Sequence, residues 1–328
     1  MSIKEVKRFY TGSSCRLDLF LSQQLDQSRN QILHLIKNGC VRVEDKVVTK
    51  AGFKPKVGAS VCVTIFEAEN RKLDVDFDVD VLYEDDHILV VNKPSNLVVH
   101  PAPSVKEATL VDWLQAKGIA LSTLSGDLRH GIVHRIDKDT SGALVVAKNN
   151  AAHQKLSKQL EDKSMGRYYL AVIDMELKDD CIVAKPVARN PRNRLKMACI
   201  AGGKSAKTAF KKLIQSKNSR YELIAAKLFT GRTHQIRVHL NSLSRHIVGD
   251  VSYGFKTNND RINRFFLHAY ILYLKHPVTG ELMYFKAPLP DEYVEILKNR
   301  FDMEKVDEKI DPKCITASFT DCSKWMCY

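Results

Sequence analysis

Gly131-Ile-Val-His-Arg-Ile-Asp-Lys-Asp-Thr-Ser-Gly142 is the stretch that decides the fold of this 328-residue chain. It opens on the apolar pair Ile132-Val133 and leads into the apolar run Ala143–Ala147, and both are predicted to be strands. Asp137 therefore lies in a loop at the end of a strand, where functional residues are common. The bare pattern has a second interpretation, because Asp, Thr and Ser oxygens also cap ordinary turns. The rest of the chain has to distinguish the two.

Composition and charge indicate a globular protein that binds a polyanion. Hydrophobic residues make up 44% of the chain and charged residues 27%, with 51 Lys and Arg against 38 Asp and Glu. Residues 1–65 carry a net charge of +6, residues 67–86 carry −7, and residues 187–220 contain ten basic side chains and no acidic one. A merely solvated surface usually mixes both signs, whereas basic groups that neutralise phosphates release counterions. The uneven charge therefore favours nucleic acid as the partner.

Several other classes of protein are disfavoured. No apolar run reaches the roughly 20 residues that cross a membrane, and the charged N-terminus does not resemble a secretory signal, so we expect a cytoplasmic protein. The eight cysteines include no Cys-x-x-Cys pair, which indicates free thiols and no metal site. The phosphate-binding Gly-rich string is absent, and Asp139 interrupts the pattern of an aspartyl-phosphate site at Asp137, so phosphoryl transfer is also disfavoured.

The first 65 residues predict a small α/β module. Leucines four residues apart over 17–25 indicate one face of a helix. Ser28 followed by Gln31 is a capping box that begins a second helix, and short strand patterns follow at 40–43 and 61–65. The module is therefore predicted to be two helices followed by small strands.

This order of elements resembles the S4 RNA-binding module over about residues 14–65. The resemblance implies that exposed basic side chains, among them Arg29 and Lys37, contact RNA. Residues 66–80 then alternate acidic and apolar side chains, and we interpret them as an acidic linker to the next domain.

Residues 81–300 are predicted to form an α+β domain whose sheet is mostly antiparallel. Strand patterns recur at 88–91, 143–147, 168–173, 221–224 and 236–240. Helical patterns cover 109–116 and 151–161. Residues 301–328 are polar and charged, and we interpret them as a poorly ordered tail.

Five motifs of this domain, in chain order, resemble those of the RluA-type RNA pseudouridine synthases. The opening stretch resembles the signature His-Arg-Leu-Asp-x-x-Thr-Ser-Gly, with Ile136 in place of leucine, a change that conserves volume. The further matches are Asn92–Pro94 with Val98–Pro101, Arg167–Val172, Thr230–Leu240, and Gly249–Gly254 followed by Phe266–Ala269, His276-Pro277 and Ala287–Pro290. The resemblance implies the pseudouridine synthase fold and an enzyme without a cofactor.

The resemblance also implies catalytic roles. Isomerising uridine breaks the N1–C1′ bond, turns the base and rejoins it through C5, and Asp137 matches the family's nucleophilic carboxylate. Arg237 matches the arginine that pairs with this carboxylate, and arginine can hold a carboxylate in a bidentate fork without losing its charge. Tyr169 matches the tyrosine that stacks on the base and can remove the C5 proton. Ile236 matches an apolar wall against the base.

RNA contacts are implied in the same way. The target base must be flipped out of its stack, and Arg135 matches the arginine that fills the vacated place while His134 supports the same loop. We expect further RNA contacts from Thr140 and Arg232, and a backbone clamp formed by Arg189, Arg192 and Arg194.

An S4-like module joined to this catalytic domain indicates a synthase of large-subunit (23S) ribosomal RNA. The motifs look closer to the D type than to the C type of these synthases. The expected partner is ribosomal RNA or a pre-ribosomal particle, with no membrane, and the expected state is a monomer. The alternative is a non-catalytic RNA-binding ribosome assembly factor. The presence of Asp137, Tyr169 and Arg237 together favours the enzyme.

Overall fold

The computed structural model describes residues 3–25, 27, 29–66, 73–102, 104–126, 129–256, 262, 264–322 and 325–328. The chain divides into two compact units, one formed by Met1–Asp74 with Ser122–Gly131 and the other by Val75–Leu121 with Ile132–Tyr328. The predicted capping residue Ser28 and residues 67–72 of the predicted linker lie outside the described residues.

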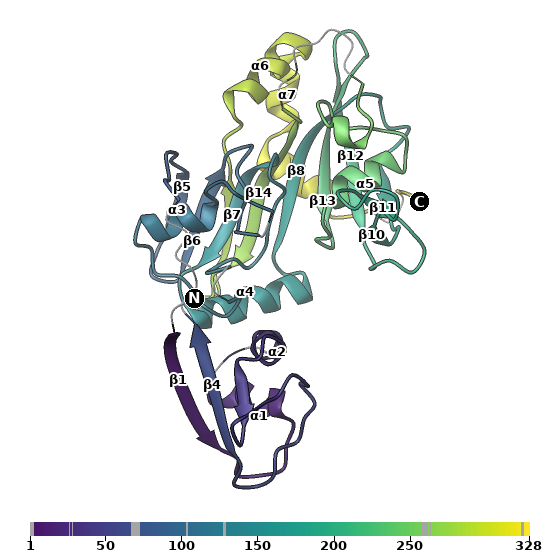
Figure 1. The fold of residues 1–328 in the computed structure, drawn as a ribbon. Helices are drawn as coiled ribbons and strands as arrows, with labels where there is room; N and C mark the ends of the chain where they lie inside the picture. Colours follow the sequence, from purple (N-terminus) through teal and green to yellow (C-terminus); the bar gives the residue numbers. More distant parts are fainter. Residues whose placement is uncertain are drawn as a thin grey trace. The chain divides into compact units, whose positions relative to one another are not determined.

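The N-terminal unit combines a four-stranded antiparallel sheet with two helices (Figure 1). The strands, in sheet order, are β1 (Ile3–Tyr10), β4 (Ser60–Phe66), β2 (Val41–Val43) and β3 (Lys46–Val47), and the helices are α1 (Leu17–Leu25) and α2 (Arg29–Lys37). The two predicted helices are confirmed, and Leu17, Leu21 and Ile32 are fully buried in the core of this unit. Strand β1 precedes the predicted start of the module at residue 14. Its charged residues gave no apolar pattern, because β1 is an edge strand.

The second unit is built on a ten-stranded sheet (Figure 1). Its order is β16–β9–β12–β13–β8–β14–β7–β6–β5, with β15 paired to β14. The strands are β5 (Asp80–Glu84), β6 (Ile88–Lys93), β7 (Ser141–Ala147), β8 (Gly166–Ile173), β9 (Cys181–Val183), β12 (Thr208–Gln215), β13 (Glu222–Leu228), β14 (Leu267–Lys275), β15 (Leu282–Lys286) and β16 (Met326–Cys327). Only β7–β14 and β9–β16 pair in parallel among the described strands. The predicted α+β class with a mostly antiparallel sheet is confirmed.

Helices and a hairpin surround this sheet. They are α3 (Leu110–Ala116), α4 (Asn150–Asp162), α5 (Gln235–Asn241), the 3-10 helix η1 (Val251–Tyr253), α6 (Asp291–Arg300), α7 (Met303–Lys309), α8 (Pro312–Ser318), and the hairpin of β10 (Val187–Arg189) and β11 (Met197–Cys199). The predicted helices over 109–116 and 151–161 are confirmed as α3 and α4. Helix α3 begins with a capping box in which Thr109 and Asp112 each accept the other's backbone N–H, which explains its clear sequence signal.

The predicted strand over 236–240 is wrong, because these residues form α5. Apolar residues alternate there with Arg237 and His239, which imitates a strand with one exposed face. All of residues 235–240 are in fact buried. The ring of His239 contacts Thr208 Oγ1 at 2.9 Å and the Lys185 carbonyl at 3.0 Å, so the polar positions are buried with partners.

The prediction of a poorly ordered tail is also wrong for the described residues after Phe301. Helices α7 and α8 bury Val306, Ile310, Ile315 and Phe319 against the sheet core that contains Tyr168. The Phe319 ring lies 5.4 Å from that of Tyr168. Each apolar pair is spaced four residues apart, but charged residues on the other faces of these short helices concealed the pattern.

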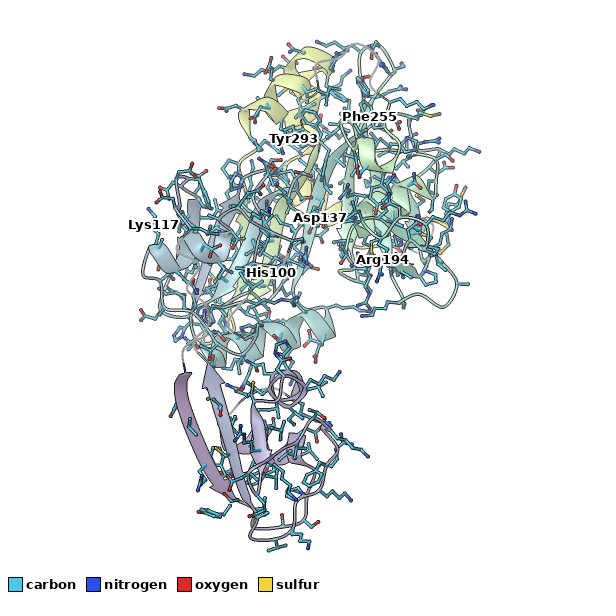
Figure 2. The ribbon with its side chains drawn as sticks, viewed as in Figure 1. His100, Lys117, Asp137, Arg194, Phe255 and Tyr293 are labelled. Atoms are coloured by element: carbon cyan, nitrogen blue, oxygen red, sulfur yellow. The ribbon has the colours of Figure 1, made fainter. Side chains whose placement is uncertain are left out.

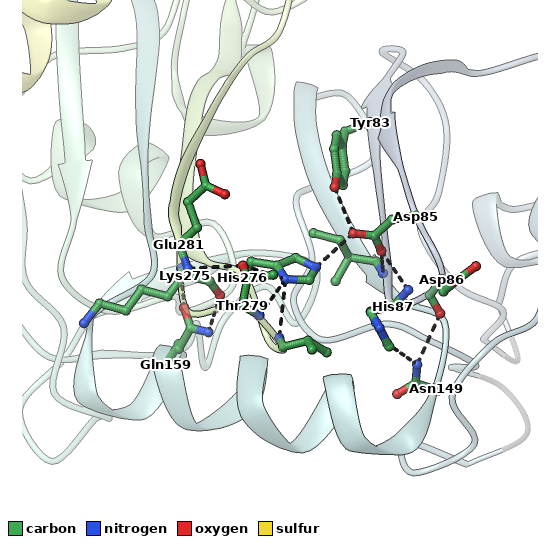
Figure 3. Close-up of polar contacts among 12 residues, drawn as sticks. Tyr83, Asp85, Asp86, His87, Asn149, Gln159, Lys275, His276, Thr279 and Glu281 are labelled. Carbon is green, nitrogen blue, oxygen red and sulfur yellow. Dashed lines mark hydrogen bonds and ion pairs between the residues drawn. The ribbon is translucent and has the colours of Figure 1, made fainter.

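The side chain of Asp85 forms several hydrogen bonds at the edge of the sheet near β5 (Figure 3). Asp85 Oδ1 accepts the backbone N–H groups of His87 and Ile88 at 2.7 and 2.8 Å. Its Oδ2 lies 2.9 Å from both Tyr83 Oη and His276 Nε2. His276, part of a motif singled out in the sequence, therefore links the β14–β15 turn to the β5–β6 turn and is not among the residues that line the cavity described below.

Candidate active site

The opening stretch forms a turn that enters β7. Ile132 makes an isolated bridge with Val146 where a strand was predicted, and the Thr140 amide donates to the Asp137 carbonyl at 3.2 Å. Gly142 follows with φ +114°, and a Cβ at this position would overlap the backbone of Ala269 on β14. Glycine is therefore required where β7 begins to pair with β14.

Two side chains from the end of β6 hold the Asp137 turn. The fully buried Lys93 donates from Nζ to the carbonyls of Pro94, Leu97 and Lys138, at 2.6, 2.8 and 2.9 Å. Burial lowers the pKa of Lys93 to about 7. Ser95 Oγ donates to the Asp139 carbonyl at 2.7 Å. The sequence analysis gave Lys93 no role, although the motif Asn92–Pro94 contained it.

A cavity of about 520 Å³ opens beside this turn, wholly within the second unit. It is lined by every site residue predicted in the catalytic domain except the backbone clamp: His134, Arg135, Asp137, Thr140, Tyr169, Arg232, Ile236 and Arg237. Figure 2 marks Asp137 in the interior of this unit. The fold therefore brings residues from the β7 turn, β8 and α5 to one place.

Arg237 connects two carboxylates at one end of the cavity. Its Nη1 lies 3.3 Å from Asp137 Oδ2. Its bidentate fork is directed at Asp250, with Nε 2.6 Å from Oδ2 and Nη2 2.9 Å from Oδ1. The expectation that Arg237 would hold Asp137 in a fork is therefore wrong, because Asp250 occupies that edge of the guanidinium. Nη2 also donates to Ser252 Oγ at 2.6 Å, and this hydroxyl in turn donates to Asp250 at 2.7 Å.

The arginine is buried but remains charged. Its guanidinium carbon lies 4.7 Å from the Tyr253 ring centre and 4.8 Å from that of Phe265. Burial opposes the charge, yet the hydrogen bonds and charge of Asp250, followed by the charge of Asp137, outweigh burial and raise the pKa of Arg237. The side chain of Asp250 is 2% exposed and that of Asp137 is 16% exposed. Asp137 is thus the carboxylate of this cluster that a substrate can reach.

Tyr169 and Ile236 form apolar walls of the same cavity. Tyr169 lies on β8, opposite Ala226 of β13 and Ala269 of β14, and these small neighbours leave room for its ring. Burial raises the pKa of Tyr169, so its phenol keeps its proton at neutral pH. Ile236 projects from α5 and is 3% exposed.

The other predicted residues of the turn differ in their surroundings. His134 is buried, and its Nδ1 accepts from Arg167 Nη1 at 2.6 Å. Burial, followed by the charge of Arg167, lowers the pKa of His134, so the ring is neutral. Arg135 is exposed and makes no hydrogen bond or ion pair with the described residues. Thr140 Oγ1 is buried without a partner among them.

Arg189, Arg192 and Arg194 lie on the exposed β10–β11 hairpin. Figure 2 labels Arg194 there. The loop is internally braced, since Asn190 Oδ1 accepts the amides of Arg192 and Asn193 at 2.8 and 3.1 Å. Arg189 donates to the Arg194 carbonyl. These arginines therefore extend from a structured loop outside the cavity.

In the N-terminal unit the two predicted RNA-binding residues differ. Lys37 is exposed in the last turn of α2. Arg29 donates to Asp18 Oδ2 at 2.8 Å, and Arg16 reaches the same carboxylate at 2.9 and 3.0 Å. The Arg29 guanidinium thus has a structural partner that the sequence analysis did not identify.

Sequence reasoning also missed Asp250, Ser252, Tyr253 and Arg167 as parts of the site. Gly249-Asp250 and Tyr253-Gly254 were recognised as motif residues without a role. Their role depends on η1 lying beside α5, which no local pattern reveals. Among the described residues, no cluster of three or more His, Cys, Asp or Glu is arranged to hold a metal ion. No described helix is long and apolar enough to cross a membrane.

Comparison with known proteins agrees with this geometry. A model of the RNA pseudouridylate synthase family matches residues 87–242, and a model of the S4 domain matches residues 15–61. An uncharacterised RNA pseudouridine synthase of Helicobacter pylori is 46% identical over 314 residues, which cover 93% of this chain and 95% of that protein. The chain belongs to the RNA pseudouridine synthase family. It is therefore an RNA-modifying isomerase with an S4 domain, and the resemblance noted in its sequence is confirmed.

Other members of the family are similar over most of their length. The ribosomal large subunit pseudouridine synthase D of Nitrosomonas europaea is 38% identical over 296 residues, which cover 86% of this chain and 83% of that protein. The structure of human RNA pseudouridylate synthase domain containing 1 has a TM-score of 0.53 at 24% identity and covers 69% of this chain and 96% of its own. At that identity the human structure supports the fold alone.

Proposed function

We propose that this pseudouridine synthase isomerises specific uridines of large-subunit (23S) ribosomal RNA, with Asp137 as the nucleophile. The observation that carries the proposal is the cavity in which Asp137, 3.3 Å from Arg237, faces Tyr169 and Ile236. The similarity to a ribosomal large subunit pseudouridine synthase D supports ribosomal RNA as the substrate. We infer a monomer, since one chain supplies every wall of the cavity, and the cytoplasm as the compartment in which ribosomal RNA is modified.

The reaction adds and removes no atoms overall. The N1–C1′ bond breaks, the C5–C1′ bond forms, the C5 proton leaves and N1 gains a proton. A carboxylate that attacks the nucleoside divides this exchange into two steps, as carboxylates do in retaining glycosidases. Arg237 keeps a positive charge 3.3 Å from Asp137 Oδ2 and orients the carboxylate by this contact. Because Asp250 holds the arginine fork, Asp137 keeps oxygen lone pairs for the attack.

Tyr169 is proposed to stack on the uracil. Burial raises the pKa of its phenol, so the resting enzyme presents a neutral ring that packs against the base, and Tyr169 is also proposed to accept the proton that leaves C5. Ile236 supplies the opposing apolar surface. Together they hold the ring near C1′ after the glycosidic bond has broken, which limits escape of the base.

RNA delivery is proposed to use several regions of the chain. Arg135 is exposed beside the nucleophile and can occupy the place of a flipped base. The arginines of the β10–β11 hairpin and the S4 domain, through Lys37 and its basic neighbours, are proposed to contact the phosphate backbone.

The test is a map of pseudouridine in ribosomal RNA from cells with and without this protein. We expect one or a few positions of 23S ribosomal RNA to lose pseudouridine when the gene is deleted and to regain it when the gene is restored. An identical map in both strains would refute ribosomal RNA as the substrate.

A further inference from the structure

The cavity has an excess of positive charge that the proposed chemistry does not use. Asp137 is the only carboxylate among the described residues that line it. The lining also includes six cationic side chains: Arg135, Lys163, Arg167, Lys227, Arg232 and Arg237. Arg237 is neutralised by Asp250 and Asp137, and Arg135 has the proposed role in base flipping. Of the other four, the cations at positions 163, 167 and 227 have no assigned function, and Arg232 has only the RNA contact expected from the sequence.

Arg167 is the most unusual of the four because it is buried. It lies on β8 two residues before Tyr169, so both side chains point to the same side of the sheet. Only 7% of Arg167 is exposed. Its Nη1 donates to His134, which is neutral and does not offset the charge. No carboxylate of the described chain pairs with Arg167, and burying an unpaired cation is costly.

The free edge of the Arg167 guanidinium is a fork. Its Nε is buried and lacks an acceptor among the described residues. Its Nη2 lies beside Gly231, where an added Cβ would be 3.5 Å away, and makes no hydrogen bond within the described chain. Nε and Nη2 together present the two parallel donors that bind two oxygens of a phosphate. A bound anion would satisfy both the unpaired donor and the unpaired charge.

The neighbouring cations extend this positive region. Lys163 occupies the left-handed C-cap position of α4, and Arg232 lies in the loop before α5, where its Nε donates to the Ser205 carbonyl at 3.0 Å. Lys227 is paired across the sheet with Tyr168, and its Nζ lies over the rings of Tyr168 and Phe229, at 5.4 and 5.5 Å, on the face of the sheet opposite to Arg167. Neither Lys163 nor Arg232 forms an ion pair with a carboxylate in the part of the chain that the structure describes. Their charges therefore remain available to a ligand.

We propose that Arg167, supported by Lys163 and Arg232, forms a phosphate subsite that binds a backbone phosphodiester beside the target uridine. This rests on the proposed function, since the phosphate belongs to the RNA whose uridine reaches Asp137. The subsite makes Arg167 a binding residue that fixes the sugar relative to the carboxylate. The simpler reading is that Arg167 only orients His134, and the experiment separates the two.

The experiment compares Arg167→Gln and Arg167→Lys with the wild-type protein on a 23S ribosomal RNA transcript. The dissociation constant and kcat/KM are measured from low to moderate KCl concentration. We expect Arg167→Gln to lower kcat/KM about 10- to 100-fold and to make the slope of log Kd against log salt shallower by about 0.7 to 0.9, the value of one phosphate contact. Arg167→Lys keeps the charge and should keep the slope while losing part of the affinity, because lysine cannot form the fork.

Arg264→Gln is the matched control. The Arg264 side chain is 10% exposed, donates to Ser141 Oγ at 2.8 Å and lies 3.6 Å from Glu292, and it is outside the cavity lining. Its removal should leave the salt slope unchanged, whatever its effect on turnover. An unchanged slope in Arg167→Gln, with kcat/KM reduced, would show that Arg167 acts only through His134 and would overturn the subsite.

Inorganic phosphate distinguishes the source of the anion. At constant ionic strength it should inhibit turnover of the wild-type protein competitively with RNA and should inhibit Arg167→Gln less. Phosphate could inhibit the wild-type protein more than Arg167→Gln while the slope of log Kd for RNA against log salt is the same in both proteins. That result would show that Arg167 binds free phosphate and not the RNA backbone, and it would contradict the proposal. If the wild-type protein forms no pseudouridine in the transcript, the proposed function fails, while the binding slopes still decide whether Arg167 contacts a phosphate.

Discussion

Two arginine–carboxylate clusters, one in each unit of the chain, use the same groups in opposite ratios. In the N-terminal unit a single carboxylate, Asp18, accepts from two arginines, Arg16 and Arg29, at 2.8 to 3.0 Å. In the second unit a single arginine, Arg237, serves two carboxylates. Asp250 receives its fork and Asp137 receives one contact at 3.3 Å.

The ratio decides what each cluster can do. Asp18 is 6% exposed, and Arg16 and Arg29 hold its pKa near 2, so its oxygens are satisfied and its contribution is structural. In the cavity the donors are fewer than the acceptors, and Asp250 takes most of them. Asp137 is left partly exposed and incompletely hydrogen-bonded, which are properties of an available nucleophile.

The largest expected effect comes from replacing the shared arginine. Arg237→Lys removes the fork and leaves one point charge for two carboxylates, so we expect the single-turnover rate on ribosomal RNA to fall about 1,000-fold, or ~4 kcal/mol in the barrier. The matched change Arg16→Lys in the N-terminal cluster should alter this rate less than about twofold. Equal rate losses in the two variants would show that the clusters do not differ as described.

The next effect separates the two carboxylates of the cavity. Asp250→Asn frees the fork of Arg237 to turn toward Asp137, and we expect the single-turnover rate to fall about 100-fold and the unfolding free energy to fall by ~3 kcal/mol, because a buried pair loses one charge. Denaturant unfolding and quench-flow turnover measure the two quantities. A variant that keeps full activity would show that Asp137 does not depend on Asp250.

The N-terminal cluster should respond to pH. The pKa of Asp18 in the folded protein is about 2, below its ordinary value of about 4, so its stabilisation is complete above pH ~4 and is lost as pH falls toward 2. The shift corresponds to about 2 kcal/mol. Hydrogen exchange of the α1 and α2 amides at pH 5 and pH 3 should show about half of this loss, ~1 kcal/mol, because the folded carboxylate is still ionised at pH 3. Asp18→Asn should lose the part of the pH dependence due to this group, and an unaltered dependence would contradict the pairing.

The smallest effect concerns the hydroxyl that bridges Arg237 and Asp250. Ser252→Ala removes the contacts at 2.6 and 2.7 Å without changing any charge, so we expect a loss of ~1 kcal/mol in stability and a severalfold lower turnover rate. Ser22→Ala in the N-terminal unit is a control, since Ser22 Oγ donates to the Gln27 carbonyl at 2.6 Å away from the chemistry. A similar loss of turnover in both variants would argue against a role for Ser252 in fixing the arginine.

The sequence predicted those elements whose signals are local. The capping box at Thr109 and the clear period of α4 located two helices, and the motif around Asp137 located the turn before β7. The α5 segment was misassigned because the buried polar partners of Arg237 and His239 come from other elements. Helices α7 and α8 were not predicted because their apolar partners are also distant in the sequence. Phe319, for example, packs on Tyr168, about 150 residues earlier.

The sequence predicted which residues form the candidate site but did not predict how they are arranged. Motif matches named Asp137, Tyr169 and Arg237, and the fold brings all three to one cavity. The partner of the arginine fork could not be predicted, because Asp250 lies 13 residues further along the chain in a different element. Likewise, only burial reveals that Arg167 lacks a partner at Nε.

The central claim is that Asp137 is the reacting carboxylate and that its neighbours only prepare it. Asp137→Asn keeps the size of the side chain and removes the charge, so we expect no pseudouridine in a 23S ribosomal RNA transcript after prolonged incubation, with RNA binding within about twofold of the wild-type protein. Pseudouridine formation by Asp137→Asn at a rate comparable to the wild-type protein would contradict the assignment of the nucleophile.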